Sequence, residues 1–302
     1  MTQWPDWRSA WTSALYGPGG FYLRPEGPAG HFRTASHAAP GDLGRGLARL
    51  CAELGCQAVV DVGAGRGELL SGLSGCLPAS FSMHGVEVVP RPERLPERVG
   101  WFVGVEQVPP SAWRDALVIA WELLDVIPCS VLELDADRDV RQVLVEPFSG
   151  REKLGMPADL ADLDWCARWW PRDDLTHGDR IESGIARDAF WSSLVARALA
   201  GQARAILAVD YGHRRETRPR LGSLTGFQGG RAVPPRPDGS MDVTAHVAMD
   251  AVAVAGRAAG ALSAHLSRQG EELAALGVRS PELLDPGGLG AFDWLLQVLT
   301  HG

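Results

Sequence analysis

Blocks of apolar residues alternate with amphipathic blocks along the middle of the chain. Short runs that are largely apolar are typical of strands buried on both faces of a sheet, and the run at 116–120 is apolar at every position. The expected strands lie at 58–62, 82–88, 101–104, 116–120 and 204–212. Residues 68–77 follow a helical period between the first two strands. This alternation predicts an α/β fold, a Rossmann-like sheet that is mostly parallel and carries helices on both faces.

Outside this sheet the pattern predicts helices, one hairpin and two irregular segments. Val131–Leu134 and Val140–Val145 flank a polar turn and predict an inserted β-hairpin. Trp4, Trp7 and Trp11 share one helical face, which either packs on its own domain or meets a partner. We further expect helices at 157–170, 184–200 and 243–254 (the last capped by Asp242), irregular structure at 16–46 and 213–240, and an edge strand at 292–299.

Composition narrows the classes of function. The chain has 302 residues and a net charge of −8, so it lacks the basic excess that binds nucleic acid by simple electrostatics. No signal-peptide pattern and no membrane-spanning run is seen. The number of cysteines is odd, without a CxxC pair, which predicts reduced thiols, no metal site and a cytoplasmic location. They are Cys51, Cys56, Cys76, Cys129 and Cys166.

The clearest motif is a glycine loop that directly follows the first strand. Asp61-Val-Gly63-Ala64-Gly65-Arg-Gly67 has the spacing GxGxG, with an acid two residues before the first glycine. Glycines let the backbone turn tightly and approach a ligand, and the following helix start offers amides. A dinucleotide fold would show GxGxxG instead. The loop, with Ala64 inside it, therefore favours S-adenosylmethionine over NAD, the acid facing the amino-acid part of the cofactor.

A second acid supports the same cofactor. Glu87 ends the next strand, 26 residues after Asp61, where a carboxylate can bind both ribose hydroxyls. Val88 and Trp121, at the ends of their strands, are expected to line the same site. Either signal alone has a simple structural alternative, a tight turn or a surface acid. Together, in this order on these strands, they predict a nucleoside-type ligand.

Two more acids follow the fourth strand, in Trp121-Glu-Leu-Leu-Asp-Val-Ile-Pro128. Glu122 and Asp125 would share a face if this turn is helical, and two carboxylates there are suited to gripping a guanidinium. The alternative is a capped helix start with solvated acids. His37 is a candidate general base for a hydroxyl or amine acceptor, although a lone histidine in a glycine-rich loop is more often structural. His246 is expected either to fix local structure or to reach the cleft.

Several segments together resemble the MidA-like methyltransferases, relatives of a mitochondrial complex I assembly factor that methylates an arginine. The similarity is colinear from residue 15 to about residue 290. The matching segments start at Leu15, Gly30, Val62, Glu122, Arg180, Val209, Gly222 and Met241. The resemblance implies a class I methyltransferase sheet with an added helical and hairpin region, and methyl transfer from S-adenosylmethionine, in one case to protein arginine.

This chain departs from the family pattern mainly among the residues expected to face the methyl acceptor. His31 replaces an acid, Thr34-Ala-Ser-His37 replaces a Thr-Ser-Pro-Glu run, Trp121 replaces an asparagine, and Asp61 stands where glutamate is common. The cofactor residues are thus kept while the substrate side has lost acids. The expected function is methyl transfer to a nitrogen or another nucleophile of a protein or small molecule. The alternatives are a weak or inactive assembly protein that binds the cofactor, and a small-molecule N- or O-methyltransferase.

These motifs predict three parts of the chain. Residues 1–50 would form an N-terminal helix and loop over the active site. Residues 51–130 and 200–302 would form the cofactor-binding domain, and 131–199 a hairpin and helical cap for the substrate. In such a site Glu122 and Asp125 would orient the acceptor, while the enzyme acts mainly by positioning and by excluding water.

Overall fold

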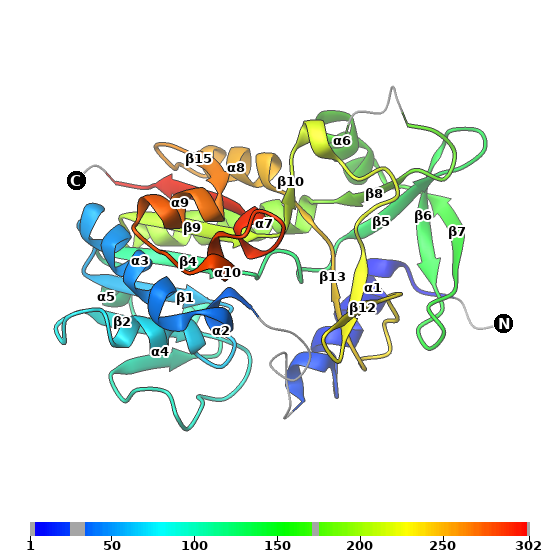
Figure 1. Ribbon diagram of the computed structural model, residues 1–302. Coiled ribbons are helices and arrows are strands. Elements are labelled where there is room, and N and C mark those ends of the chain that lie inside the picture. The colour runs from blue at the N-terminus through cyan, green and yellow to red at the C-terminus, as the bar shows by residue number, and fades with distance from the viewer. Residues whose placement is uncertain (1–3, 25–33, 171–174, 301–302) are drawn as a thin grey trace. The chain divides into compact units, whose positions relative to one another are not determined.

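The chain folds into two compact units, each built from three segments. The computed structural model describes residues 4–24, 34–170 and 175–300. Unit 1 comprises residues 1–32, 125–189 and 212–252, and unit 2 comprises 33–124, 190–211 and 253–302. His31, one of the departures from the family pattern, lies outside the described residues. Figure 1 labels the elements of both units.

Unit 2 holds a seven-stranded sheet in the order β15-β16-β9-β4-β1-β2-β3. Strands β9, β4, β1, β2 and β3 are all parallel to one another. Strand β16 runs antiparallel to both of its neighbours, β9 and β15. This confirms the predicted α/β sheet. The strands are β1 (Ala58–Val62), β2 (Ser82–Val86), β3 (Val99–Phe102), β4 (Ala116–Trp121), β9 (Ala205–Asp210), β15 (His265–Arg268) and β16 (Asp293–Val298).

Helices cover both faces of this sheet. On one face, leucines of α3 and α4 pack against Val59, Leu117 and Leu207 of the central strands. On the other, Trp191 of α7 donates from Nε1 to Gln297 Oε1 of β16 at 2.7 Å. The helices with residues in unit 2 are α2 (Ala35–Ala38), α3 (Pro40–Glu53), α4 (Glu68–Ser74), α5 (Pro110–Trp113), α7 (Ile185–Ala200), α8 (Met249–Ala258), α9 (Gln269–Ala275) and α10 (Pro281–Leu284), with 3-10 turns at Val105–Gln107 and Leu289–Ala291.

Two expectations for unit 2 are wrong in detail. The tail is a strand, as predicted, but β16 is inserted between β15 and β9 rather than lying at the edge. The segment 16–46 is not irregular throughout, because α3 begins at Pro40. Its Gly44 lies where an added Cβ would meet the backbone oxygen of Gly72 at 2.7 Å, so the glycine permits close packing of α3 on α4.

The described residues of unit 1 form three small sheets. The predicted hairpin is present as β5 (Ser130–Leu134) and β6 (Val140–Val145), and it belongs to a four-stranded antiparallel sheet of order β7-β6-β5-β8. The remaining elements are β7 (Glu152–Pro157), β8 (Arg180–Ser183), β10 (Gly212–His213), β11 (Thr225–Gln228), β12 (Arg231–Val233), β13 (Asp242–Thr244), β14 (Val247–Ala248), α1 (Trp7–Tyr16), α6 (Leu160–Trp169) and 3-10 turns at Phe21–Leu23 and Arg215–Thr217.

The N-terminal tryptophans do not all share one helix. Trp7 and Trp11 lie in α1 and are fully buried, and Trp7 Nε1 donates to Glu152 Oε1 at 2.6 Å. Trp4 precedes the helix, whose N-cap is Asp6. The ammonium group of Lys153 stands 4.7 Å from the Trp4 ring centroid. The face is therefore packed within unit 1, as in the first of the two interpretations.

The segment 243–254 was expected to be a helix, but only its part from Met249 onward is helical. Asp242–Thr244 pairs as β13 with β11, Val247–Ala248 forms β14, and α8 begins only at Met249. Asp242 is therefore no helix cap but a buried strand residue. The alternation of apolar residues here is too short to distinguish a strand from a helix by periodicity.

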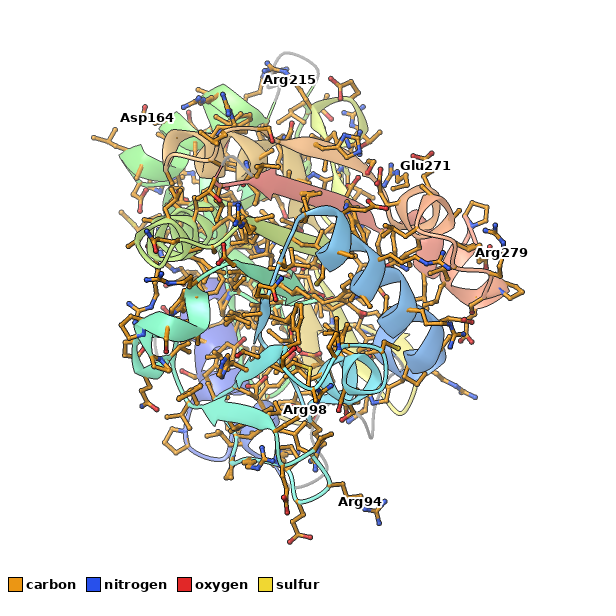
Figure 2. All side chains as sticks on the ribbon, turned by 90° about the vertical axis from the view of Figure 1, so that its left-hand side faces the viewer. Arg94, Arg98, Asp164, Arg215, Glu271 and Arg279 are labelled. Carbon is orange, nitrogen blue, oxygen red and sulfur yellow. The ribbon has the colours of Figure 1, made fainter. Side chains whose placement is uncertain are left out.

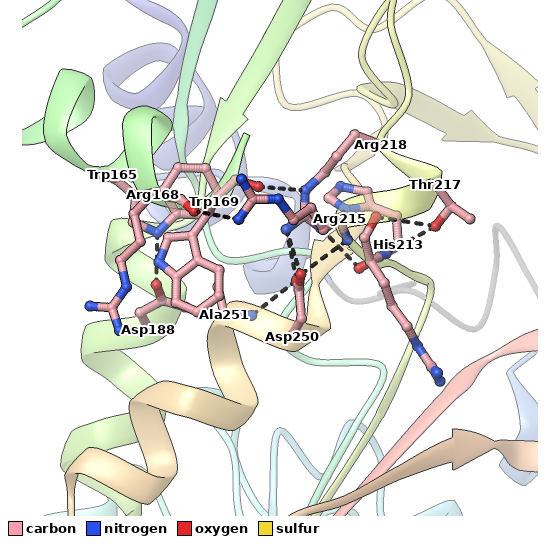
Figure 3. A network of polar contacts seen from close by, with 11 residues as sticks. Trp165, Arg168, Trp169, Asp188, His213, Arg215, Thr217, Arg218, Asp250 and Ala251 are labelled. Carbon is pink, nitrogen blue, oxygen red and sulfur yellow. Dashed lines mark hydrogen bonds and ion pairs between the residues drawn. The ribbon is translucent and has the colours of Figure 1, made fainter. Parts of the chain in front are cut away.

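The segment 213–240 is not irregular throughout, because it contains β11 and β12, and its arginines form ion pairs (Figure 3). Arg218 donates to both carboxylate oxygens of Asp250, at 2.7 and 2.9 Å, and from Nε to the carbonyl oxygen of Trp169. The amide of Arg215 donates to Asp250 as well. Arg220 pairs with Asp179 at 2.6 Å. These arginines therefore join the segment to α6 and α8.

Charges of both signs occur at the surface. On unit 2 the exposed side chains of Arg94, Glu271 and Arg279 extend away from the ribbon, whereas Arg98 bends back to bind carbonyl oxygens near the end of α4 (Figure 2). None of the helices in the described part of the chain has the length and apolar character needed to cross a membrane.

Candidate cofactor and acceptor site

The glycine loop after β1 adopts a conformation that only glycine accepts easily. Gly63, Gly65 and Gly67 have φ angles of 77°, 57° and 78°, in the left-handed region. A Cβ on Gly63 would also stand 2.7 Å from the Leu123 side chain. A Cβ on Gly67 would collide with the Leu95 side chain, so Gly63 and Gly67 meet both a backbone and a packing requirement, and Gly65 mainly a backbone requirement.

Each amide of this loop has a partner within unit 2. The amides of Gly63 and Ala64 donate to the carbonyl oxygen of Val86 at 2.9 and 3.1 Å, and the amide of Gly67 donates to that of Ala64 at 2.7 Å. The amide of Gly65 donates to Glu87 Oε2 at 3.0 Å. The loop is thus fixed before any ligand binds, and the sequence did not predict that Glu87 helps to fix it.

Acids gather around the loop, and within the described part of the chain no cation is among the charges that shift the pKa values of Asp61 and Glu87. Asp61 is 2% exposed, and burial together with the charges of Glu87 and Glu68 raises its pKa to about 8. Burial also raises the pKa of Glu87, against the opposing effect of its bonds from the amides of Val88 and Gly65. Such a set of acids favours a ligand with positive charge and hydroxyl groups.

The other expected cofactor residues differ in exposure. Val88 is 47% exposed, and its amide donates to Glu87 Oε1 at 2.7 Å. Ala64 is buried in the loop. Trp121 is buried at the end of β4 and packs edge-on against Trp294, with ring centroids 5.8 Å apart. The ring of Trp121 therefore belongs to the core of the sheet.

A short segment of unit 2, Thr34–Ala39, is attached to the loop and to the end of β4. His37 lies between Thr34 Oγ1, 2.6 Å from Nδ1, and Glu68 Oε1, 3.2 Å from Nε2. The amide of Ala35 donates to Glu122 Oε1 at 3.0 Å. Both ring nitrogens of the expected general base are thus engaged, and Glu122 has a contact within unit 2.

The turn after β4 is strained and is not helical. Glu122 has φ 52°, an uncommon value for a residue with a side chain. Its amide donates to the carbonyl oxygen of Val209, and that of Leu124 donates to Asp210 Oδ2, each at 2.8 Å. The condition under which Glu122 and Asp125 would share a helical face is therefore not met. Glu122 belongs to unit 2 and Asp125 to unit 1.

Within unit 1, Asp125 lies beside a buried arginine. Arg187 is 2% exposed and donates to three carbonyl oxygens, those of Asp125 and His246 at 2.8 Å and that of Ile127 at 3.2 Å. Burial raises the pKa of the Asp125 carboxyl to about 6, while the charge of Arg187 opposes the shift. Arg187 therefore holds the backbone of the acidic turn and compensates its charge.

Asp242 and Tyr22 complete this acidic group and were not predicted. Tyr22 Oη donates to the Asp242 carboxylate, 3.2 and 3.1 Å from its two oxygens. Asp242 is fully buried, and burial followed by the charge of Asp125 raises its pKa. Tyr22 stacks on Tyr16 with centroids 5.5 Å apart. The sequence signal was an acid and a tyrosine inside two segments already noted for their resemblance.

The backbone of His246 has a local structural role, while the role of its imidazole stays a prediction. Its amide donates to Ser223 Oγ at 2.8 Å and its carbonyl oxygen accepts from Arg187. Burial and the charge of Arg187 lower its pKa. The same Ser223 also contacts Glu182 of β8, a buried acid. Glu182 accepts hydrogen bonds from the amide and the hydroxyl of Ser223.

Comparison with known proteins decides the class of this site. A family model described as "Putative S-adenosyl-L-methionine-dependent methyltransferase" matches residues 43–267. This chain belongs to that family. No curated protein matches the sequence.

Two solved structures have the same fold as this methyltransferase. One is a COG1565 superfamily protein from Burkholderia thailandensis bound to S-adenosyl-homocysteine, with 22% identity, a TM-score of 0.80, and coverage of 99% of this chain and 89% of that one. The other is the native structure of a COG1565 superfamily protein from the same organism, with 22% identity, a TM-score of 0.78 and the same coverage.

The cofactor of the methyltransferase is S-adenosylmethionine, and the loop residues fit it. The cofactor carries an ammonium group, a sulfonium group and a ribose. The residues of unit 2 suited to bind these groups, Asp61 and Glu87, are acids. Asp61 is suited to the ammonium group and Glu87 to the ribose hydroxyls. Among the residues that the structure describes, no group of three or more His, Cys, Asp or Glu side chains is placed to hold a metal ion.

Proposed function

We propose that the methyltransferase is a MidA-like enzyme that methylates a nitrogen of a cationic acceptor, a guanidino or amino group. The observation that carries this proposal is the buried carboxyl pair of unit 1, Asp125 and Asp242, with Tyr22 bound to the second. Buried carboxylates favour a ligand that brings positive charge and N–H donors. A neutral hydroxyl acceptor would gain less from such surroundings.

In this proposal Asp125 orients the acceptor and takes its proton. The bound cofactor supplies an activated methyl group and leaves as a neutral thioether. The nitrogen lone pair forms the new N–C bond as the C–S bond breaks. The acceptor nitrogen gives one proton to Asp125: an ammonium group must lose it before its lone pair can attack, whereas a guanidinium group loses it once the new N–C bond has formed. With a pKa of about 6, Asp125 is ionised at neutral pH and accepts an N–H bond. The expectation that Glu122 also orients the acceptor stays a prediction.

The test compares nitrogen and oxygen acceptors. Wild-type protein and Asp125→Asn would be incubated with S-adenosylmethionine and either a short arginine peptide, agmatine or a catechol, and methylated products would be measured by mass spectrometry. We expect methylation of a nitrogen probe and a loss of about 100-fold in Asp125→Asn. Binding of S-adenosyl-homocysteine should be unchanged in that variant, because Asp61 and Glu87 are intact.

Other outcomes would replace the proposal. Methylation of the catechol alone would indicate an O-methyltransferase. Tight binding of S-adenosyl-homocysteine without methylation of any probe would favour the assembly protein. Equal rates for Asp125→Asn and wild type would remove Asp125 from the mechanism. The variants Glu122→Gln and Glu122→Leu test the acceptor role of Glu122 in the same assay.

We further propose that the acceptor is a protein or a small molecule rather than nucleic acid, and that the enzyme works in the cytoplasm. The net charge of −8 supports the first statement. All five cysteines are free thiols, which supports the second.

A further inference from the structure

His37 replaces an acid of the family pattern, and its surroundings suggest a role that no comparison assigns. Its ring is fixed at both nitrogens, by Thr34 Oγ1 at 2.6 Å and by Glu68 Oε1 at 3.2 Å. The His37 side chain is 29% exposed and the Glu68 side chain 25% exposed. A histidine held in this way on both sides is poorly placed to take a proton from an acceptor.

The partner of His37 is itself bound to the glycine loop. Glu68 is the first residue of α4, and its Oε2 accepts from the amide of Arg66 at 3.0 Å. The same oxygen lies 3.4 Å from the position that a Cβ on Gly65 would take, so Glu68 packs against the loop. Glu87 contacts the loop as well, by accepting from the amide of Gly65. One oxygen of Glu68 thus faces the loop and the other faces His37.

The short helix that carries His37 is held independently. Glu122 Oε1 accepts from the amide of Ala35, the first residue of α2, at 3.0 Å. The position of His37 is therefore set from the end of β4, and the position of Glu68 from α4. His37 also places a nitrogen donor against an acid whose charge acts unfavourably on both Asp61 and Glu87.

We propose that His37 is a positioning residue for the cofactor, which fixes Glu68 and thereby the Arg66 amide and the glycine loop. Loss of the imidazole frees Glu68 to rotate, and the loop then samples conformations that bind the cofactor poorly. This inference concerns unit 2 alone and does not depend on the identity of the methyl acceptor.

The test measures the affinity of the full chain for S-adenosyl-homocysteine by isothermal titration. We expect His37→Ala to bind about fivefold to tenfold more weakly, the effect of one charge-assisted hydrogen bond at a partly exposed site. His37→Gln keeps a side-chain donor for Glu68 but cannot act as a general base near neutral pH. We expect it to bind within about twofold of wild type.

Hydrogen exchange gives a second readout that does not require the bound ligand. The Arg66 amide should exchange faster in His37→Ala than in wild type, because its acceptor is no longer fixed. His265→Ala is the matched control. It removes another histidine–glutamate pair of unit 2, His265 Nε2 to Glu272 Oε1 at 2.8 Å, and should change neither readout.

Two results would overturn the inference. His37→Ala could bind S-adenosyl-homocysteine as wild type does, which is what a general base predicts for this ligand. Alternatively, His37→Gln could lose as much affinity as His37→Ala, which would exclude the bond to Glu68. Should His37→Ala fold poorly, Thr34→Val leaves the imidazole in place, removes only the Thr34 hydroxyl, and should weaken binding by about twofold.

Discussion

The two units bury their acids in opposite ways. In unit 2, the charges of Glu87 and Glu68 raise the pKa of Asp61, and the charge of Glu68 also raises that of Glu87. In unit 1, Asp125, Glu182 and Asp188 all have their pKa values lowered in part by one cation, Arg187. These three acids of unit 1 are thus partly compensated within the protein, whereas Asp61 and Glu87 of unit 2 await a positive charge from a ligand.

This difference separates a binding site from a framework. A buried carboxylate without a cation is unfavourable in the free protein, and the unfavourable energy is recovered when a cationic ligand binds. A buried carboxylate beside a fixed cation is held in one local conformation and gains less from a cationic ligand than an uncompensated one. In unit 1 Arg187 acts in this way on Asp125, whereas no cation of the described residues shifts the pKa of Asp242, so the proposed cationic acceptor is favoured by the pair rather than by Asp125 alone.

The largest expected effect comes from removing the cation of unit 1. Arg187→Met leaves Asp125 and Glu182 without compensation and frees three carbonyl oxygens. We expect the free energy of unfolding to fall by about 3 to 5 kcal/mol, the usual result of breaking a buried charged contact from one side. Denaturant unfolding, with hydrogen exchange in α1 and β8 to locate the change, measures it.

Two controls sharpen this prediction. Arg187→Lys keeps the charge but not the fork, and should lose clearly less stability than Arg187→Met. Arg218→Met removes a different buried arginine of unit 1, paired with Asp250 (Figure 3). It should destabilise the protein without moving the pKa of Asp125. If Arg187→Met were as stable as wild type, Arg187 would not compensate the buried acids of unit 1, and the contrast between the two units would be wrong.

The second effect comes from neutralising the acid of unit 2. Asp61→Asn should weaken binding of S-adenosyl-homocysteine by roughly 100-fold, as expected for a lost charge-assisted contact worth about 3 kcal/mol. Titration calorimetry measures it. Asp115→Asn is the control, since Asp115 forms an ion pair with Arg204 elsewhere in unit 2, and its variant should bind normally.

The same substitution should stabilise the free protein in a pH-dependent way. The pKa of Asp61 is about 8 in the folded chain and near 4 when unfolded. The folded state therefore holds the proton more tightly, and wild type loses stability as pH rises from about 4 to about 8. Asp61→Asn escapes this loss, so its advantage should be absent below about pH 4 and greatest near pH 8. A pH-independent difference in melting temperature would contradict the shift.

The sequence predicted most of unit 2 because its signals are local. Ala58–Val62 is apolar on both faces, and the structure confirms the strand with the same bounds. The glycine loop and Glu87 follow directly from such strands. What escaped prediction were elements with unusual composition. Helix α3 contains three glycines near its start, and β15 is a largely polar edge strand.

Unit 1 was harder to predict because its contacts join segments far apart in the sequence. Tyr22, Asp125, Arg187 and Asp242 come from four different segments, and no spacing connects them. Asp242 illustrates the problem: a polar residue before an apolar run usually caps a helix, but here it is buried in β13. Only the three-dimensional fold shows that Tyr22 supplies its partner.

The smallest expected effect tests whether unit 1 is a framework throughout. Asp6 caps α1, its carboxylate accepting from the amide of Ser9 at 2.8 Å and from the hydroxyl at 3.0 Å. Asp6→Ala should reduce stability by about 1 kcal/mol, because two donors near the helix start lose their acceptor. Asp6→Asn, which keeps an acceptor oxygen, should lose only part of this. Hydrogen exchange should quicken in α1, while affinity for S-adenosyl-homocysteine stays at the wild-type value, since no residue of the glycine loop is altered. A loss of affinity comparable to that of Asp61→Asn would show that the helix of unit 1 and the cofactor site of unit 2 are energetically coupled, and the division of labour argued from their acids would then be wrong.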